Sequence, residues 1–276
     1  MIDIRKLAFV GGGNMAAALI GGLIGRGLQP ARIFVADPNR AQLQKLTREF
    51  GVVAAPDGAS AVQDATVLVL AVKPQVMREV ATDVALHLGE PAPLIVSVAA
   101  GIPHASLLAW LGRGRSIVRA MPNRPALCGC GATGLYAPPA VGSADRALAE
   151  SVLAAVGITV WVDRESQMNT VTALSGSGPA YFFLFMEALE AAARELGLAP
   201  EVAHRLTMQT ALGAAQMANE SPDSLAVLRE QVTSKGGTTA AALAILDAAD
   251  LRGIVAGAVA AADRRSAELA AEYGAP

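Results

Sequence analysis

The N-terminal segment reads Leu7-Ala8-Phe9-Val10-Gly11-Gly12-Gly13-Asn14-Met15-Ala16. Its apolar residues predict a buried strand, and the glycines separate that strand from a predicted helix over residues 14–26. In a G-x-G-x-x-A turn of this kind, Gly11 permits the tight bend and Gly13 lets the backbone approach a pyrophosphate, while Ala16 allows close helix packing. We therefore predict a dinucleotide-binding turn at Gly11, Gly12, Gly13, Asn14 and Met15; the alternative is a merely tight turn.

Outward from this turn, strand and helix patterns alternate, which is typical of a parallel sheet with crossover helices. Residues 66–72 form the most apolar strand pattern, and we expect them to lie centrally in the sheet. Further strands are predicted at 33–36, 52–54, 94–98, 116–120, 133–137 and 158–162, and helices at 38–50, 75–88, 103–111 and 143–156.

After residue 163 the strand patterns stop and only helices are predicted. They cover residues 181–196, 200–219, 239–247 and 251–273, with a further helix capped by Ser221-Pro222-Asp223. The fold class is therefore α/β: a Rossmann-like dinucleotide-binding domain over residues 1–163, followed by an all-helical domain over residues 164–276. The last helix is apolar nearly all round at residues 254–262, so it must be enclosed, and we predict a tight homodimer.

Composition narrows the class of protein. The 276 residues are 53% apolar and 17% charged, which excludes global disorder, and the net charge of −2 argues against a nucleic-acid binder. No apolar run approaches the roughly 18 residues of a membrane span. Residues 1–6 carry charges and lead directly into a strand, so no signal peptide is indicated and a cytoplasmic protein is expected.

Several loops follow the predicted strands at their carboxyl ends, where open α/β sheets bind ligands. The first is Asp37-Pro38-Asn39-Arg40. An acidic residue there accepts from the ribose 2′-hydroxyl of NAD, whereas a nearby Arg suits the 2′-phosphate of NADP, so both cofactors are indicated. The alternative is that Asp37 only caps the following helix.

Two further loops precede predicted helices at this edge. Ala71-Val72-Lys73-Pro74 contains one of only four lysines in the chain. Residues 97–101 are small and would let a cofactor ring lie against the backbone. Met121-Pro122-Asn123 would reach the same crevice. Alone, either of these last two segments is only a turn.

The helical half contains two segments rich in glycine. Thr233-Ser234-Lys235-Gly236-Gly237-Thr238-Thr239 precedes a helix, and its N–H groups suit a carboxylate; the alternative is an ordinary helix cap. The other, at residues 175–180, implies close approach of another backbone or of a ligand.

Other chemistries find little support. Cys128 and Cys130 lack the further ligands that zinc requires, and a disulfide between them would be strained. The three histidines have neither metal-site nor triad spacing. We expect no metal centre and no nucleophilic catalysis.

Four blocks in order resemble the pyrroline-5-carboxylate reductase family over essentially the whole chain. They are Gly11-Gly12-Gly13-Asn14-Met15-Ala16, Ala71-Val72-Lys73-Pro74-Gln75, residues 171–181 and residues 232–239. The glycine turn is shared with many dehydrogenases, whereas the last two blocks are far more specific.

This resemblance implies reduction of 1-pyrroline-5-carboxylate to L-proline with NADPH, or with NADH, and a dimer that sometimes joins a larger ring. It places the 2′ region of the cofactor near Asp37, Asn39 and Arg40. The nicotinamide side would meet Ala71, Val72, Lys73, Pro74 and Ala100. The substrate carboxylate would lie at Gly236, Gly237 and Thr238, with Thr239, the expected catalytic residue, near the ring nitrogen.

The chain departs from the family pattern at three positions. Lys235 replaces a Pro, Asn169 stands where an Asp is usual, and Gly58 stands where an Asn is frequent near the adenosine. The first two bear on substrate affinity and the third on cofactor affinity. A 3-hydroxyacid dehydrogenase of similar two-domain build and a non-catalytic dinucleotide sensor are the alternatives to the reductase.

Overall fold

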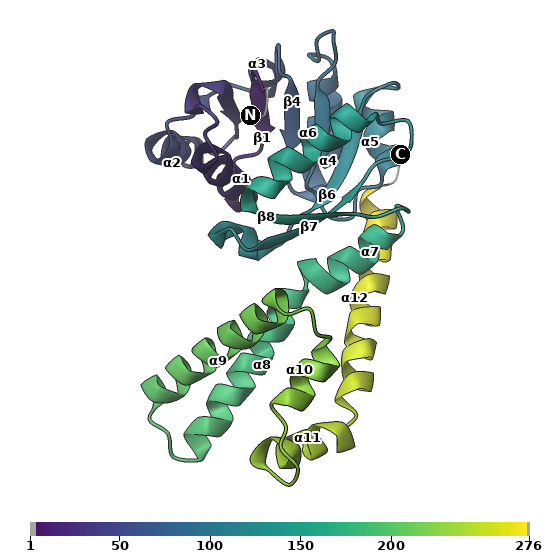
Figure 1. Ribbon diagram of the computed structural model, residues 1–276. Coiled ribbons are helices and arrows are strands. Elements are labelled where there is room, and N and C mark those ends of the chain that lie inside the picture. Colours follow the sequence, from purple (N-terminus) through teal and green to yellow (C-terminus); the bar gives the residue numbers. More distant parts are fainter. Residues whose placement is uncertain (1–3, 275–276) are drawn as a thin grey trace. The chain divides into compact units, whose positions relative to one another are not determined.

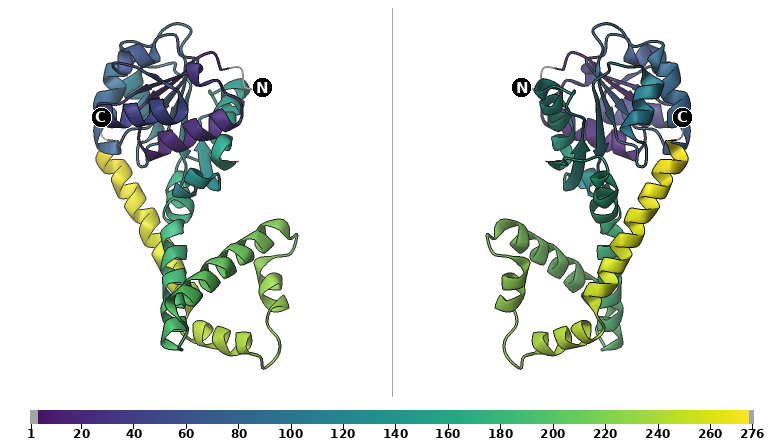
Figure 2. Two further views of the ribbon diagram at one scale, coloured as in Figure 1. Left: turned by 90° about the vertical axis from the view of Figure 1, so that its left-hand side faces the viewer. Right: turned by 90° about the vertical axis from the view of Figure 1, so that its right-hand side faces the viewer.

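The computed structural model describes residues 4–274, which form two compact units. The first contains residues 4–177 and 261–274, and the second contains residues 178–260. The last helix, α12 (Leu251–Tyr273), contributes to both, and Figure 2 shows it in yellow as one uninterrupted helix. The division at Ser177 falls later in the chain than the predicted domain boundary at residue 163, which stays a prediction. Residues 164–177 belong to the first unit.

An eight-stranded sheet forms the centre of the first unit, in the order β3-β2-β1-β4-β5-β6-β7-β8 (Figure 1). The predicted strand over residues 66–72 is β4, which is buried throughout and lies in the middle of the sheet, as expected. The strands are β1 (Leu7–Val10), β2 (Ile33–Ala36), β3 (Val53–Ala54), β4 (Val67–Leu70), β5 (Leu94–Ser97), β6 (Ile117–Met121), β7 (Gly131–Tyr136) and β8 (Gly157–Trp161).

The parallel arrangement holds for the first six strands and changes at the seventh. Strands β1 to β6 pair in parallel, whereas β7 is antiparallel to β6 and β8 is parallel to β7. The reason is the connection: only the short segment with the 3₁₀ turn η2 (Arg124–Cys128) joins β6 to β7, and a parallel neighbour requires a longer crossover.

Helices cover both faces of the sheet. One apolar cluster joins the sheet to α1, α2 and α6, and the other joins it to α3, α4 and α5. The helices of this unit are α1 (Asn14–Gly25), α2 (Arg40–Phe50), α3 (Gly58–Val62), α4 (Pro74–Ala85), α5 (His104–Leu111), α6 (Ser143–Leu153) and α7 (Gln167–Val171), with short turns η1 (Pro30–Arg32), η3 (Ala154–Val156) and the π-helical turn η4 (Thr172–Gly176).

The second unit is entirely helical. It consists of α8 (Gly178–Glu195), α9 (Pro200–Glu220), α10 (Leu225–Gln231), α11 (Thr238–Ala248) and the first part of α12. The expected cap of α10 was placed too early. Ser224 is the cap, because its hydroxyl accepts from the N–H of Val227, whereas the Ser221 hydroxyl accepts from the N–H of Asp223 in the preceding turn.

Three helical elements differ from the sequence prediction. Helix α2 begins at Arg40 rather than at residue 38, because the Asn39 side chain accepts from the N–H groups of Ala41 and Gln42. Helix α3 and the pair α7–η4 were not predicted at all; each is a single short segment with little periodicity to detect. Within residues 4–274, no helix combines the length and apolar character needed to cross a membrane.

Candidate functional site

The glycine turn after β1 has the geometry that a dinucleotide requires. Gly11 has a φ of +98°, and a Cβ there would lie 2.5 Å from the carbonyl oxygen of Ala71, so only glycine fits. By contrast, a Cβ on Gly13 would meet no atom within 4 Å. Gly13 is also the N-cap residue of α1. Because glycine has no side chain that could accept a hydrogen bond, the first N–H groups of the helix remain available to an anion. These residues fit a bound pyrophosphate.

Asp37 connects the end of β2 to this turn. Its Oδ2 accepts from the N–H of Gly12 at 2.7 Å, and its Oδ1 accepts from the N–H of Asn39 at 2.8 Å. The interpretation of Asp37 as the cap of the following helix is therefore wrong, since Asn39 caps α2. Gln42, which sequence reasoning missed, adds a third link by donating from Nε2 to the carbonyl oxygen of Gly12 at 2.6 Å.

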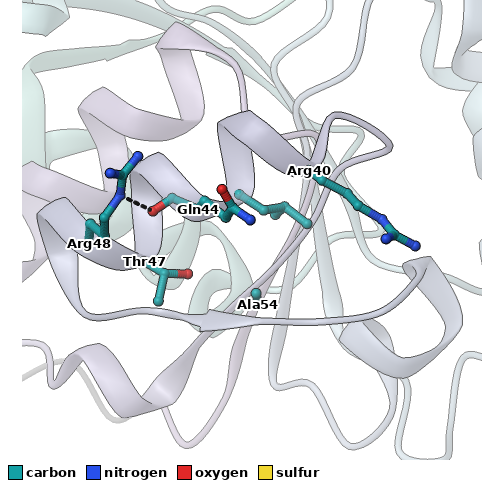
Figure 3. Close-up of a pocket in the computed structure, with 6 residues that line it drawn as sticks. Arg40, Gln44, Thr47, Arg48 and Ala54 are labelled. Atoms are coloured by element: carbon teal, nitrogen blue, oxygen red, sulfur yellow. Dashed lines mark hydrogen bonds between the residues drawn. The ribbon is translucent and has the colours of Figure 1, made fainter.

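Arg40 begins α2 beside this network. Among residues 4–274 no carboxylate pairs with its guanidinium. It borders a cavity of about 500 Å³ that extends along α2 toward β3 (Figure 3). The cavity is lined by Arg40, Leu43, Gln44, Thr47, Arg48 and Ala54. An exposed, unpaired guanidinium at this place can bind a phosphate.

The loops after β4 and β5 lie at the same edge of the sheet as the glycine turn. The N–H of Ala71 donates to the carbonyl oxygen of Val10 at 2.8 Å, so the loop after β4 is bonded directly to the end of β1, where the glycine turn begins. Lys73 is the exposed N-cap of α4, and Pro74 occupies the first turn of that helix. Ala100 follows β5, the next strand, and is partly exposed. The structure thus brings the predicted cofactor residues together along the carboxyl ends of β1, β2, β4 and β5.

A partly buried ion pair lies at the end of the β5 loop. Arg119 on β6 donates to Oε1 of Glu165 at 2.6 Å, and the N–H of His104, the first residue of α5, donates to the same oxygen at 2.5 Å. Burial lowers the pKa of the half-buried His104 ring, and Arg119 lowers it further, against the opposing charge of Glu165. No local pattern predicts this network, since its members lie up to 61 residues apart in the chain.

The second glycine segment forms a tight turn in the helical unit. The N–H of Gly237 donates to the carbonyl oxygen of Ser234 at 3.0 Å, and Gly236 has a φ of +69°. Glycine at the third turn position and Pro at the second are typical of a type II turn, so Lys235 occupies the place where the family resemblance expects Pro. The turn forms with Lys235 in place.

Helix α11 starts directly after this turn, at Thr238, with Gly237 as its N-cap and no capping side chain. Thr239 is therefore the second residue of the helix and not its cap. The N–H groups of the first turn of α11 are unpaired by side chains, as they are at α1. Gly236, Gly237, Thr238 and Thr239 are contiguous and belong to the second unit, whereas all predicted cofactor residues belong to the first.

The other two departures from the family pattern lie on the short helices α7 and α3. The Asn169 side-chain oxygen accepts from the hydroxyl of the buried Ser266 at 3.0 Å, and the neighbouring Thr170 donates to Asp263 at 2.8 Å. Both contacts join α7 to α12. Gly58 is the first residue of α3, and the side chain of Asp57 caps this helix by accepting from the N–H of Ser60.

The cysteines and the exposed His204 belong to none of the loops described above. Cys128 and Cys130 are free and exposed. His204 is exposed and pairs with Glu190 at 3.0 Å. In the described part of the chain, no group of three or more His, Cys, Asp or Glu side chains has a geometry that could hold a metal ion.

A largely parallel sheet with a glycine turn that fits a pyrophosphate, joined in one chain to a helical unit whose α11 also starts uncapped after a glycine turn, is typical of two-domain dinucleotide-dependent oxidoreductases. Comparison with known proteins agrees. Residues 6–101 match the family model described as NADP oxidoreductase coenzyme F420-dependent, and residues 165–269 match the one described as Pyrroline-5-carboxylate reductase dimerisation.

Full-length relatives are more specific. The chain is 52% identical to the pyrroline-5-carboxylate reductase of Pseudomonas aeruginosa, over 98% of each chain. The structure of a pyrroline-5-carboxylate reductase from Coxiella burnetii has a TM-score of 0.92 at 44% identity, covering 96% of this chain and 98% of that one. A Plasmodium falciparum pyrroline carboxylate reductase with NADP bound has a TM-score of 0.85 at 28% identity, covering 98% and 99%. The chain belongs to the pyrroline-5-carboxylate reductase family.

Proposed function

We propose that this protein reduces 1-pyrroline-5-carboxylate to L-proline, the last step of proline biosynthesis, with NADPH as the preferred reductant and NADH as a second one. The observation that carries the proposal is the 52% identity to a pyrroline-5-carboxylate reductase over 98% of both chains. The two anion-binding turns support it, because the reaction joins a dinucleotide to a substrate with a carboxylate.

The first unit would hold the cofactor. The open backbone at Gly13 and the uncapped start of α1 suit the pyrophosphate, and the unpaired Arg40 suits a 2′-phosphate. The nicotinamide end would lie along the loops after β4 and β5. The residues proposed to bind the cofactor are Gly11, Gly12, Gly13, Asn14, Met15, Asp37, Asn39, Arg40, Ala71, Val72, Lys73, Pro74 and Ala100.

The second unit would hold the substrate. Gly236, Gly237 and Thr238 would bind its carboxylate with the free N–H groups at the start of α11. The bound reduced nicotinamide supplies a hydride, so the chain requires no nucleophile. Thr239 would accept a hydrogen bond from the protonated ring nitrogen and stabilise its charge. Because the substrate brings this proton, the Thr239 hydroxyl orients the ring and need not deliver a proton itself.

The assembly proposed is a homodimer formed by the helical domain, with the domain boundary near residue 163. A ring of several dimers is the larger assembly that the family resemblance suggests, and the mass in solution would distinguish the two. The cytoplasm is the proposed location.

The two alternatives make different demands on the chain. A 3-hydroxyacid dehydrogenase needs a general base, commonly a Lys of the helical domain, and Lys235, in an exposed turn, is the only lysine after residue 163. A dinucleotide sensor would bind cofactor and turn over nothing. Oxidation of NADPH with and without pyrroline-5-carboxylate separates both alternatives from the reductase.

Thr239→Ala tests the proposed substrate site. Because Gly237 rather than Thr239 caps α11, the substitution should leave the thermal midpoint nearly unchanged. The value of kcat/KM should fall tenfold or more, since a hydrogen bond to a charged group contributes about 1.5–3 kcal/mol. Thr233→Ala is the matched control, because the Thr233 hydroxyl donates to the carbonyl oxygen of Arg229 at the end of α10. Normal turnover in Thr239→Ala would place the substrate elsewhere.

A further inference from the structure

The helical stretch that leads out of the first unit is interrupted by a π-helical turn, and a proline explains it. Pro179 lacks an N–H, and its ring clashes with the carbonyl group four residues earlier, which is that of Ser175. One turn of the helix is therefore wider than an α-helical turn: the N–H of Ser177 donates to the carbonyl oxygen of Thr172, five residues back, at 2.8 Å. The carbonyl oxygen of Ser175 thus loses its ordinary helical partner.

Asn123 binds this carbonyl oxygen from another part of the fold. Its Nδ2 donates to Ser175 O at 3.0 Å, and its Oδ1 accepts from the N–H of Ala132, beside the start of β7, at 2.9 Å. The Asn123 residue is only 8% exposed. A buried amide with both ends bonded fixes both partners, because leaving either end unpaired is costly.

The π-helical turn lies at the edge of the sheet where the cofactor loops lie. Ser97, the last residue of β5, pairs with Arg119 of β6, so the carboxyl ends of these two parallel strands lie side by side. A Cβ on Gly176 would lie 2.7 Å from Cε of Met121, so the turn packs directly against the end of β6. The turn η4 therefore lies at the carboxyl end of β6, the strand next to β5, which the Ala100 loop follows.

We propose that Asn123 is a positioning residue: it holds η4 in its widened form at the carboxyl end of β6, where the turn forms a wall beside the nicotinamide. The proposal rests on the proposed reductase function. Both ends of the Asn123 amide are occupied by backbone partners. It acts through the backbone of Ser175, so its loss should change how the substrate meets the nicotinamide and leave the binding of the dinucleotide itself unchanged.

Asn123→Asp isolates the contact with η4. The substitution keeps a side-chain oxygen for the N–H of Ala132 and replaces the Nδ2 donor by an oxygen that repels the carbonyl oxygen of Ser175. In the ligand-free protein, the amides of residues 176–178 should exchange with solvent about tenfold faster. The value of kcat/KM for pyrroline-5-carboxylate should fall on the order of tenfold, and the NADPH dissociation constant should stay within about twofold.

Pro179→Ala disturbs the same turn with Asn123 intact, which covers the case in which Asn123→Asp does not fold. An N–H at position 179 lets the carbonyl oxygen of Ser175 re-enter a regular helix, so the amides of residues 176–178 should exchange more slowly while kcat/KM falls. Val152→Ala, at a buried position of α6, is the matched control. It should lower stability and leave both exchange at 176–178 and kcat/KM unchanged.

The results that would contradict the role of Asn123 differ from those that would contradict the reductase function. Unchanged exchange at residues 176–178 in Asn123→Asp, or faster exchange with kcat/KM within twofold of the parent, overturns the proposal. A parent protein that binds NADPH and reduces no pyrroline-5-carboxylate contradicts the proposed function instead. The exchange measurement then still decides whether Asn123 holds the turn.

Discussion

The two compact units of this chain differ in how far their apolar side chains are buried. In the first unit, two clusters bury most of the large apolar residues of the sheet and its helices, with Ile158 and Val160 on the edge strand β8 among the exceptions. In the second, α10 and α11 contain no buried residue, and Phe182, Phe183 and Leu184 on α8 are each more than 60% exposed. One unit encloses its own core, whereas the other exposes most of the surface that would make one.

Exposed apolar surface on this scale indicates an interface between protein chains. The pattern agrees with the match of residues 165–269 to a dimerisation family model. It also explains why α12 is apolar on several sides, since Ile254 and Val255 are exposed in the single chain. The first unit encloses its own core, whereas the second exposes apolar surface that a partner chain would cover.

Leu184→Asp should break this difference most strongly. Leu184 is 67% exposed on α8, and a carboxylate buried in a dimer interface without a partner is expensive, so the dimer dissociation constant should rise a hundredfold or more, about 3 kcal/mol. Analytical ultracentrifugation measures it. Leu86→Asp is the matched control, because Leu86, 79% exposed at the end of α4 in the first unit, should tolerate the charge. Equal behaviour of the two variants would remove the distinction between the units.

Core truncations should reveal the same difference as a dependence on protein concentration. Leu68→Ala, in fully buried β4, should cost about 2–5 kcal/mol at any concentration. Leu212→Ala removes a 60% exposed side chain of α9, so its effect should appear mainly through the dimer and diminish as concentration rises. Thermal unfolding over a hundredfold range of concentration measures both. A concentration-independent loss in Leu212→Ala would mean that α9 is stabilised within one chain.

Substitutions in the two units should also differ in their effect on cofactor binding. Asp37→Asn removes a negative charge near the proposed 2′-phosphate, so NADPH affinity should rise relative to NADH by about fivefold, roughly 1 kcal/mol. The affinities for both cofactors should also weaken. In the parent chain both Asp37 oxygens accept from backbone N–H groups of the glycine turn and of Asn39, and the Nδ2 of an Asn cannot accept. Thr239→Ala, in the second unit, should leave the NADPH to NADH ratio unchanged. Fluorescence titration with each cofactor gives the ratio. An unaltered ratio in Asp37→Asn would limit this residue to supporting the glycine turn.

The sequence predicted what depends on local pattern. The strand–glycine–helix turn at residues 7–16, the central position of β4 and the long helices of the second half all carry their signal within a few residues, and the structure confirms them. The role of Asp37 was left open between cofactor and helix cap. Its geometry excludes the cap, because the hydrogen bonds of Asn39 decide where α2 begins.

What could not be predicted depends on residues distant in the chain. Glu165 meets Arg119 and His104 only after the sheet has formed, and Asn123 meets Ser175 across 52 positions. The reversed direction of β7 likewise follows from a short connection that resembles an ordinary loop. In hindsight one local signal was available: Pro179, four residues after Ser175, marks the place where a continuous helix must be interrupted.

The smallest predicted effect concerns the two histidines that the units treat differently. His104, at the start of α5, is half-buried, and its Nε2 has no hydrogen-bond partner, whereas His204 on α9 is exposed. Burial lowers the pKa of His104 below its ordinary value of 6.5. The unfolded chain therefore binds a proton at His104 at a higher pH than the folded one does. Stability is complete above the ordinary value and is lost as pH falls from there through the lowered pKa.

His104→Gln removes this titration, so the free energy of unfolding should decline less between about pH 7 and pH 5 than it does in the parent chain. His204→Gln is the comparison variant: it removes an exposed histidine that pairs with Glu190, and it should not reproduce the change expected for His104→Gln. Denaturant unfolding monitored at several pH values measures both. A steeper decline in His104→Gln than in the parent would show that the charged ring is stabilised in the fold, with the attraction of Glu165 outweighing burial.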